Sequence, residues 1–233
     1  MANNGETHMV AFEAPCGQYR GKSGELIKIT LMKLTKKQKA IIYGVIFGDG
    51  YLQKTGTQNA RLRVEHSKKQ EAYAQWLYEN LENIFSDKPK RIDRVHPKNK
   101  KTYEYVRLQS NASPWFGKLR QKFYDNSNKK VVPSEIALFL ESPLSLAVWY
   151  MDDGYYYARD KSAHFYLPNY NQEGRARIIS ALKNNFDINA TAYCRPDRNA
   201  CHITINGADL HQFKNIIKPY LIPSMRYKLP LTP

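Results

Sequence analysis

Two segments of this sequence are nearly all apolar, and each leads into an aspartate followed by a glycine. The first is Ala40–Gly48, which leads into Asp49, and the second is Ser145–Asp152, which leads into Asp153. Each has the length of a short helix, and a helix that is apolar on all sides is buried on all sides. Glycine is a usual residue at which a helix stops. The sequence therefore predicts two buried helices, each with a carboxylate at its C-terminal end.

Gly44 and Gly48 lie on one face of the first predicted helix, where a second helix can approach closely. If the two helices pack side by side, Asp49 and Asp153 converge. A helix C-terminus carries negative partial charge, so carboxylates there need a compensating cation. Carboxylates and the free carbonyls of the helix ends form a hard-oxygen site suited to Mg²⁺, which phosphodiester hydrolysis uses to activate water. One Asp-Gly after a helix is usually only a turn, but two matched copies indicate a shared site.

The predicted elements after each apolar helix follow one order, which indicates an internal duplication. Each half runs strand, helix, hairpin, helix. In the first half these elements are Arg61–His66, Ser67–Phe85, the hairpin arms Arg91–His96 and Thr102–Gln109, and Pro114–Tyr124. In the second half they are Ala163–Leu167, Glu173–Phe186, the hairpin arms Ala190–Arg195 and Ala200–Ile205, and Gly207–Ile217.

Two lysines keep a similar position in the two halves. Lys130 follows Asp49 by 81 residues, Lys228 follows Asp153 by 75, and a proline comes soon after each lysine. We therefore divide the chain into an irregular leader at 1–33, a first half at 34–134 and a second half at 135–233. Within the leader, Leu26–Met32 either adds a strand or lies along the surface.

The charge of the chain points to an anionic partner. Lys and Arg number 36 against 21 Asp and Glu, a formal net charge of +15, and the 42% of hydrophobic residues suffice for a core. Such an excess is typical of proteins that bind polyphosphate, although charge alone does not separate DNA from RNA or an anionic membrane. No apolar run approaches the roughly 20 residues of a membrane-spanning helix, and no signal-peptide pattern opens the chain. We expect an intracellular protein with no membrane partner.

Three cysteines, Cys16, Cys194 and Cys201, are too few and too scattered for a disulfide framework. Cys194, Cys201 and His202 fit no common zinc-ligand spacing, and no second pair accompanies them. We interpret Cys194 and Cys201 as small residues on neighbouring strands of a hairpin.

The stretches Ile42–Gly50 (IYGVIFGDG) and Leu146–Gly154 (LAVWYMDDG) resemble the paired motifs of the LAGLIDADG homing endonuclease family. The tail, with Lys218–Pro223 (KPYLIP) and Tyr227–Pro230 (YKLP), resembles the end of its single-chain, two-motif branch. The resemblance spans about residues 34–230 and leaves out the leader. It implies an α+β fold of two pseudo-symmetric αββαββα halves packed through the two LAGLIDADG helices, with saddle-shaped antiparallel sheets facing the DNA major groove.

The resemblance also implies a reaction and its residues. The reaction is Mg²⁺-dependent hydrolysis of both strands of a long double-stranded DNA site, by an intron-encoded monomer without an obligate protein partner. Mn²⁺ is expected to substitute for Mg²⁺, and Ca²⁺ to bind without supporting cleavage. The implied catalytic residues are Asp49, Asp153, Lys130 and Lys228, and the implied metal ligands are Asp49, Asp153, Gly48 and Asp152. The lysines either stabilise charge on the phosphorane and polarise water, or only contact phosphate. The protein is expected beside host DNA, in an organelle matrix or a prokaryotic cytoplasm.

This chain departs from the family pattern in three places. Val148 stands where a small residue would ease close helix packing, so we expect a looser helix contact there. The second motif offers two acids, and its register with the following glycine favours Asp153 over Asp152. A water-positioning polar residue usually projects from the first strand of each half. Glu65 is the nearest candidate in the first half, but the corresponding Phe165–Leu167 supplies none.

Base reading is expected from alternate residues of the sheets, where Arg or Lys pairs with guanine and Gln or Asn with adenine. A shift of one residue in register reverses every such assignment. The Lys98–Lys101 cluster is interpreted as a phosphate-contacting turn or a solvated hairpin tip. The candidate DNA-binding residues are Gln53, Lys54, Arg61, Arg63, Arg91, Arg94, Lys98, Lys100, Lys101, Arg107 and Gln109 in the first half, and Tyr157, Arg159, Lys161, Arg195, Arg198 and His202 in the second.

Two other functions fit the same fold. An RNA maturase that assists splicing of its own intron RNA would keep the basic surface and dispense with the metal carboxylates. A regulator that binds DNA without cutting it would do the same. The presence of Asp49, Asp153, Lys130 and Lys228 favours the nuclease, although a dual role stays open.

Overall fold

The computed structural model describes residues 18–20, 26–28, 33–167, 170–195 and 200–230. These form two units, residues 1–34 and residues 35–233. In the first unit, strands β1 (Gln18–Arg20) and β2 (Leu26–Lys28) pair antiparallel, with Tyr19 opposite Ile27. The first part of the predicted Leu26–Met32 segment therefore forms a strand, and the rest of that segment lies outside the described residues.

The second unit contains a similar run of elements twice. The first run is α1 (Lys36–Phe47), β3 (Tyr51–Lys54), β4 (Ala60–Ser67), α2 (Glu71–Asn80), β5 (Lys90–Val95), β6 (Thr102–Gln109) and α3 (Pro114–Phe123). A short helix α4 (Ile136–Phe139) precedes the second run, which is α5 (Pro143–Asp153), β7 (Gly154–Tyr157), β8 (Ser162–Tyr166), α6 (Gln172–Phe186), β9 (Thr191–Arg195), β10 (Ala200–Ile205) and α7 (Gly207–Ile217). Among the described residues, 3₁₀ helices lie at Lys68–Gln70, Lys218–Tyr220 and Pro223–Lys228.

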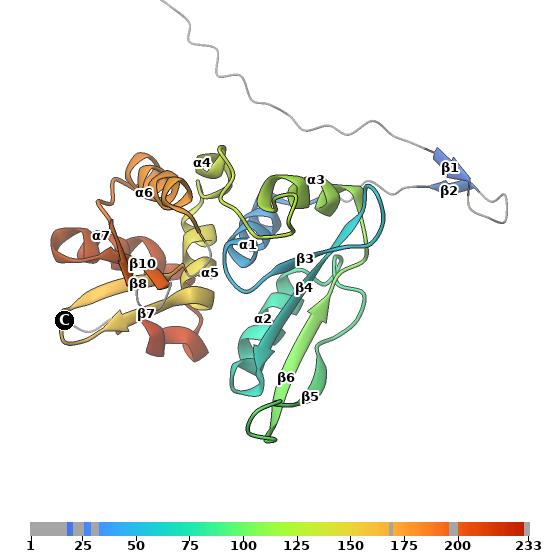
Figure 1. Cartoon of the computed structure of the whole chain (residues 1–233), viewed down its shortest axis with the longest axis horizontal. Coiled ribbons are helices and arrows are strands. Elements are labelled where there is room, and N and C mark those ends of the chain that lie inside the picture. Colours follow the sequence, from blue (N-terminus) through green and yellow to red (C-terminus); the bar gives the residue numbers. More distant parts are fainter. Residues whose placement is uncertain (1–17, 21–25, 29–32, 168–169, 196–199, 231–233) are drawn as a thin grey trace, which may run out of the picture. The chain divides into compact units, whose positions relative to one another are not determined.

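Each run builds one four-stranded antiparallel sheet, with strand orders β3-β4-β6-β5 and β7-β8-β10-β9 (Figure 1). The identical order confirms the predicted α+β fold with two αββαββα halves. The strand pattern alone missed β3 and β7, because each is only four residues long and follows directly on a helix end. The predicted helix Ser67–Phe85 is wrong at both ends, since a 3₁₀ turn precedes Glu71 and regular helix stops at Asn80.

The strand registers define which residues of the two sheets are equivalent. Tyr51 of β3 and Tyr155 of β7 are equivalent, because each follows its Asp-Gly pair. Tyr51 pairs with Arg63 and Tyr155 pairs with His164, so Arg63 and His164 occupy equivalent positions in the two sheets. Counting along the strands from that pair makes Glu65 equivalent to Tyr166, and makes His66 equivalent to Leu167.

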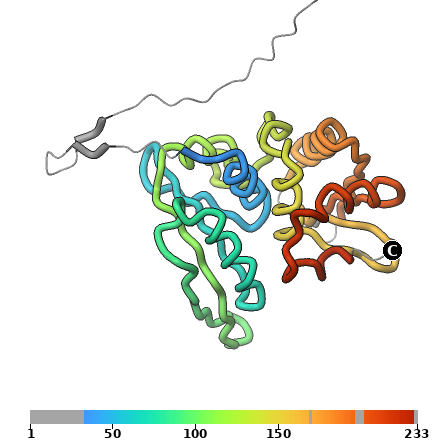
Figure 2. Tube along the Cα trace, turned by 180° about the vertical axis from the view of Figure 1, so that it is seen from behind, coloured from blue at the N-terminus to red at the C-terminus, as the bar shows by residue number. Residues whose placement is uncertain are grey.

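Helices α1 and α5 pack side by side between the two sheets (Figures 1 and 2). A Cβ atom at Gly44 would lie 2.6 Å from both Ser145 O and Val148 Cβ, and one at Gly48 would lie 2.3 Å from Asp152 Cβ. Both glycines are therefore needed for this close approach, as predicted. The expectation of a looser contact at Val148 is wrong, because its side chain fills the space that Gly44 leaves.

The apolar sequence of the two helices is buried on nearly all sides. Ile41, Ile42 and Ile46 of α1 and Trp149 and Tyr150 of α5 are fully buried. Burying one large apolar side chain stabilises a fold by about 1.5–3 kcal/mol, so this helix pair forms a central part of the core. In the part of the chain that the structure describes, no helix is both long and apolar enough to span a bilayer.

Candidate active site at the paired helix ends

The two helices end in the same way. Gly48 caps α1, its N–H donating to Gly44 O at 3.1 Å, and Asp49 follows. Asp153 is the last residue of α5, and the N–H of Gly154 donates to Tyr150 O. Asp49 is 43% exposed through its side chain and Asp153 is partly exposed, whereas the Asp152 side chain is fully buried. Of the two acids in the second helix, Asp153 is therefore the one that faces solvent.

In each half, a lysine side chain donates to the carbonyl oxygen of the residue just before the Asp-Gly pair. Lys130 Nζ donates to Gly48 O at 2.7 Å, and Lys228 Nζ donates to Asp152 O. Both lysines come from segments far along the chain, and Tyr150 OH in turn donates to Lys228 O at 3.0 Å. The structure thus brings together the four residues Asp49, Asp153, Lys130 and Lys228 in two equivalent arrangements.

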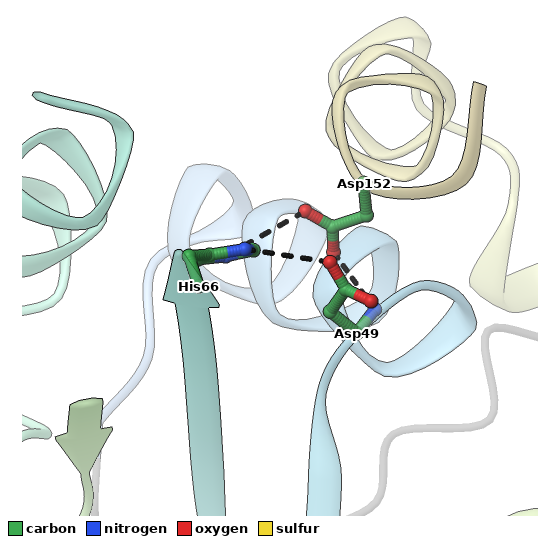
Figure 3. A group of neighbouring side chains, drawn as sticks. All are labelled: Asp49, His66 and Asp152. Carbon is green, nitrogen blue, oxygen red and sulfur yellow. Dashed lines mark hydrogen bonds and ion pairs between the residues drawn. The ribbon is translucent and has the colours of Figure 1, made fainter. Parts of the chain in front are cut away.

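Asp152 and His66 join the two helix ends on the buried side (Figure 3). Asp152 Oδ2 accepts from the Asp49 N–H at 3.1 Å. His66, at the end of β4, places Nδ1 3.4 Å from Asp49 Oδ2 and Nε2 3.9 Å from Asp152 Oδ1. The ring therefore lies beside two carboxylates, one at the end of each helix.

The carboxylates of this cluster differ in their ease of ionisation. Burial, opposed by the charge of His66, raises the pKa of Asp152 to about 7. Burial and the nearby Asp49 charge raise the pKa of Asp153 to about 7, although Lys130 opposes them. Burial also raises the pKa of Asp49, but the hydrogen bond and charge of His66 outweigh it, so that the net pKa of Asp49 is lowered. Asp49 is the acid that ionises first.

Burial and neighbouring charges also shift the pKa values of the basic groups in this cluster. Burial lowers the pKa of His66, but Asp49 and Asp152 raise it by more than burial lowers it, so the net shift is upward. Burial lowers the pKa of both Lys130 and Lys228, and the surrounding aspartates only partly offset it. Carboxylates with raised pKa values next to lysines with lowered ones are typical of a functional site.

Comparison with known proteins agrees with this geometry. Residues 39–213 match the model of the LAGLIDADG DNA endonuclease family. The DNA endonuclease I-ChuI of Chlamydomonas applanata is 31% identical over 85% of this chain and 96% of that protein.

The chain belongs to the LAGLIDADG DNA endonuclease family.

Further relatives show what else this family includes. A probable intron-encoded endonuclease of Wickerhamomyces canadensis is 27% identical over 84% of this chain and 85% of that protein. A cytochrome b mRNA maturase of Debaryomyces hansenii is 26% identical over 84% of this chain and 74% of that protein. The homing endonuclease I-WcaI bound to its DNA recognition sequence superposes with a TM-score of 0.77 at 27% identity, covering 87% of this chain and 90% of that one.

The donor atoms at this LAGLIDADG site fit a hard divalent cation. Asp49 and Asp153 offer carboxylate oxygens, and the carbonyls of Gly48 and Asp152 each keep one lone pair after accepting from a lysine. The buried Asp152 Oδ1 has no hydrogen-bond partner. Carboxylate and carbonyl oxygens are the ligands that Mg²⁺ and Ca²⁺ prefer.

His66 is the site residue that the sequence analysis missed. Glu65 was the expected polar residue of β4, but its carboxylate accepts from Arg94 and Arg107 on the uncovered face of the sheet. His66 lies on the opposite face, in line with the buried Leu62 and Val64. A histidine on the otherwise apolar, buried face of a strand needs a buried polar partner. The position of His66 in the alternation of β4 was therefore the sequence signal for this residue.

Most of the predicted DNA-binding residues lie on one face of each sheet, the face that the helices leave uncovered, here called the open face. Register and alternation place there Gln53, Arg61, Arg63, Arg94, Arg107 and Gln109 of the first sheet and Tyr157, Arg195 and His202 of the second. Exposed turns carry Lys98, Lys100, Lys101, Arg159 and Lys161.

Two of the predicted residues point elsewhere. Arg91 pairs with Glu71 of α2, both Nε and one terminal nitrogen lying 3.1 Å from the carboxylate. Lys54 alternates with Gln53 and so projects to the opposite side of β3. Neither is retained as a base-reading candidate, because strand alternation turns both from the open face. Arg198 lies outside the described residues.

The hairpin of β9 and β10 contains a bond that the sequence analysis did not predict. Cys194 and Cys201 face each other across the two strands, as expected, and their sulfurs form a disulfide. His202 is the next residue along β10 and projects to the open face, away from both sulfurs. These three side chains therefore do not converge on one point.

Proposed function

We propose that this LAGLIDADG protein is a site-specific homing endonuclease that hydrolyses both strands of a double-stranded DNA target as a Mg²⁺-dependent, intron-encoded monomer. The observation that carries the proposal is the paired arrangement of one solvent-facing aspartate and one half-buried lysine at the C-terminal end of each helix of a tightly packed pair. Two equivalent sets of groups in one chain supply one set for each strand. We propose that the protein acts inside the cell, beside host DNA.

Each half contributes the same two functions in this mechanism. Asp49 and Asp153, with the carbonyls of Gly48 and Asp152, would hold the divalent cation. A bound Mg²⁺ supplies Lewis acidity and activates water for attack on phosphorus. Lys130 and Lys228 lie beside the carbonyls at the helix ends, where they stabilise the negative charge that develops on the phosphate oxygens.

The open faces of the two sheets form the proposed DNA-binding surface. Arg63 donates to both Gln53 and Gln109, and Glu65 holds Arg94 and Arg107, so the first sheet presents an ordered polar network. Such Arg and Gln side chains suit base edges in the major groove. The net charge of +15 supplies the sequence-independent attraction to phosphates. The similarity to I-WcaI in complex with DNA supports the same placement of a duplex.

The first test is cleavage of a plasmid library that carries random inserts, with Mg²⁺, Mn²⁺ and Ca²⁺ in parallel. We expect one long site to be recovered with Mg²⁺ and with Mn²⁺, and binding without cleavage in Ca²⁺. Sedimentation of the DNA complex should show one protein chain for each duplex. The absence of cutting under all three metals, despite salt-sensitive duplex binding, would contradict the nuclease and support a non-cleaving DNA-binding protein.

The maturase is the second candidate function, because a cytochrome b mRNA maturase matches most of this chain. Its test is binding and splicing of an intron RNA cloned from the host element, compared with a duplex of equal length. Splicing stimulated equally by wild type and by Asp49→Asn would establish an RNA function that does not use the metal site.

A further inference from the structure

The open face of the second sheet carries a continuous group of aromatic side chains, here called the aromatic row. Tyr155 stacks on His164 with ring centroids 4.9 Å apart, and His164 lies 4.8 Å from His202. The ring of Tyr193 lies 5.3 Å from that of His202. The row thus crosses all four strands, from β7 through β8 and β10 to β9. Its members are Tyr155, Tyr157, His164, Tyr166, Tyr193 and His202.

Four tyrosines of the row are open to solvent. Tyr155 and Tyr157 are 39% exposed, Tyr166 is 45% exposed and Tyr193 is 57% exposed. A folded protein gains nothing from leaving such large apolar rings in water, and a contiguous patch of them marks an interaction surface. Tyrosine combines an apolar ring with a hydroxyl that donates and accepts, which suits a wet interface.

Several of the same positions in the first sheet carry charged side chains, although Tyr51 is the equivalent of Tyr155. Arg63 is equivalent to His164, and Glu65 is equivalent to Tyr166. Glu65 pairs with Arg107 of β6 and Tyr166 pairs with His202 of β10, so Arg107 is equivalent to His202. The two halves therefore share a backbone and differ in the chemistry that they present. A single target contacted by both sheets meets Arg, Gln and Glu on one side and neutral aromatic rings on the other.

The row carries no positive charge at neutral pH, because burial lowers the pKa of both His164 and His202 below the usual value. Among the described residues of this face, positive charge lies at the margins, on Arg195 at the end of β9 and on Arg159 and Lys161 in the β7–β8 turn. An uncharged centre between cationic margins matches a duplex groove between two lines of phosphates. Guanine offers only acceptors in the major groove, so a strip without Arg or Lys does not favour it.

We propose that the aromatic row reads one half of the DNA target through the C5-methyl groups of thymines, while the Arg–Gln network of the first sheet reads the other half through hydrogen bonds to purines. The proposal rests on the proposed function, since it requires a duplex across both open faces. Apolar contact with the thymine methyl is an established mode of major-groove reading. The hydroxyls of the four tyrosines remain available for the exposed base edges next to those methyls.

The test uses the site recovered from the plasmid library and measures binding in Ca²⁺. Thymidine is replaced by deoxyuridine, which lacks only the methyl, in one half of the site at a time. We expect about fourfold weaker binding for each contacted methyl removed in one half, and no change in the other. With Tyr166→Ala or Tyr193→Ala, replacing thymidine by deoxyuridine should no longer weaken binding. The control Tyr220→Ala, which changes an exposed tyrosine away from the row, should behave as wild type.

The outcomes separate this inference from the proposed function. A recovered and cleaved site whose two halves are both insensitive to deoxyuridine overturns the inference and leaves the nuclease intact. Sensitivity that persists unchanged in both row variants also overturns it. Tighter binding of the wild type to single-stranded DNA or RNA than to the duplex would show that the row stacks unpaired bases instead. If no duplex is bound at all, the proposed function fails and the inference fails with it.

Discussion

The backbone N–H of Asp49 donates to Oδ2 of Asp152 at 3.1 Å, which joins the ends of two helices whose residues lie 103 positions apart. This contact assigns the two acids of the second motif to different tasks. Asp152 faces the other helix and His66, while Asp153 faces solvent beside Trp149, whose Nε1 lies 3.3 Å from Asp153 Oδ2. We therefore propose Asp153 as the metal-binding acid and Asp152 as a residue that holds the helix ends together.

Asparagine substitutions test this division. Asp49→Asn and Asp153→Asn should each abolish cleavage, because a metal ligand is lost, while duplex binding persists through the phosphate contacts. Asp152→Asn keeps an acceptor for the Asp49 N–H and should retain measurable cleavage. Gel assays of cutting and of binding in Ca²⁺ measure both effects. Normal cutting by Asp153→Asn, or complete loss in Asp152→Asn with binding retained, would reverse the assignment.

Each lysine should act on one strand. Lys130→Met and Lys228→Met remove a half-buried cation without adding a polar group, and the rate at one strand should fall about 10²- to 10³-fold, as when one transition-state donor is lost. Supercoiled plasmid would then accumulate as a nicked circle, which separates from the linear product on agarose. Lys98→Met in the exposed hairpin turn serves as the matched control and should leave the rates of both strands alike. Equal slowing at the two strands by Lys130→Met or Lys228→Met would contradict the assignment of one lysine to each half.

His66 is expected to make the two halves unequal, because its equivalent is Leu167. His66→Leu gives the first half the apolar residue of the second and removes the group that orients Asp49. We expect about tenfold slower cutting of one strand, with partial rescue in His66→Gln, whose amide donates to a carboxylate. A ligand-orienting contact is typically worth about 10- to 100-fold. If His66→Leu and wild type show the same ratio of nicked to linear product, His66 has only a packing role.

The glycines of α1 should be essential for stability. Gly44→Ala places a methyl 2.6 Å from a backbone carbonyl and from Val148, and neither atom can move without shifting α5. We expect a loss of about 1–3 kcal/mol in the free energy of unfolding, which is the usual cost of overpacking. Gly56→Ala is the control, because nothing lies within 4 Å of the added methyl. Urea unfolding of both variants measures the difference, and equal midpoints would show that the helices can move apart.

The raised pKa values of Asp152 and Asp153, about 7 each, predict how stability without divalent metal changes with pH. Both acids hold protons in the folded chain over a range where the unfolded chain has released them. Stability is therefore fully present below about pH 4 and is lost as pH rises towards 7. The raised pKa of His66 adds a further loss above its usual value.

Thermal unfolding in EDTA measures this effect. The melting temperature should be higher at pH 5 than at pH 8, and Mg²⁺ should raise it more at pH 8, where Asp153 is ionised and can bind the cation. A double variant with Asp152→Asn and Asp153→Asn should show a flatter profile. A melting temperature that rises from pH 5 to pH 8 in EDTA would contradict the raised pKa values.

The sequence was most informative where residue type and packing leave little choice. The apolar runs around Ile42 and Trp149 predicted the buried helix pair, and the two copies of Asp-Gly predicted that Asp49 and Asp153 would meet. Lys130 and Lys228 were found by their matched positions alone. These features depend on local composition and on duplication, both of which are visible in the sequence.

Other features depend on how the chain pairs in space. The alternation of β4 signals that His66 needs a buried polar partner, but it does not indicate which one, because Asp152 lies on a helix far away in the sequence. Arg91 was expected on the open face, but Glu71 of the neighbouring helix binds it on the other side. Likewise the register that aligns Cys194 with Cys201 depends on how the two strands pair, so the sequence predicted adjacent strands without the bond between them.

The contact of Gly48 with Asp152 sets the distance between the ends of the two helices. Because no side chain separates the helices there, the spacing between Asp49 and Asp153, the two proposed metal-binding acids, follows from backbone packing and not from either sheet. In an enzyme that cuts two strands with these acids, that spacing fixes the offset between the cuts, and thus the overhang length. Residues on the open faces can then be exchanged to redirect the protein to new sequences, while the ends that it produces stay the same length.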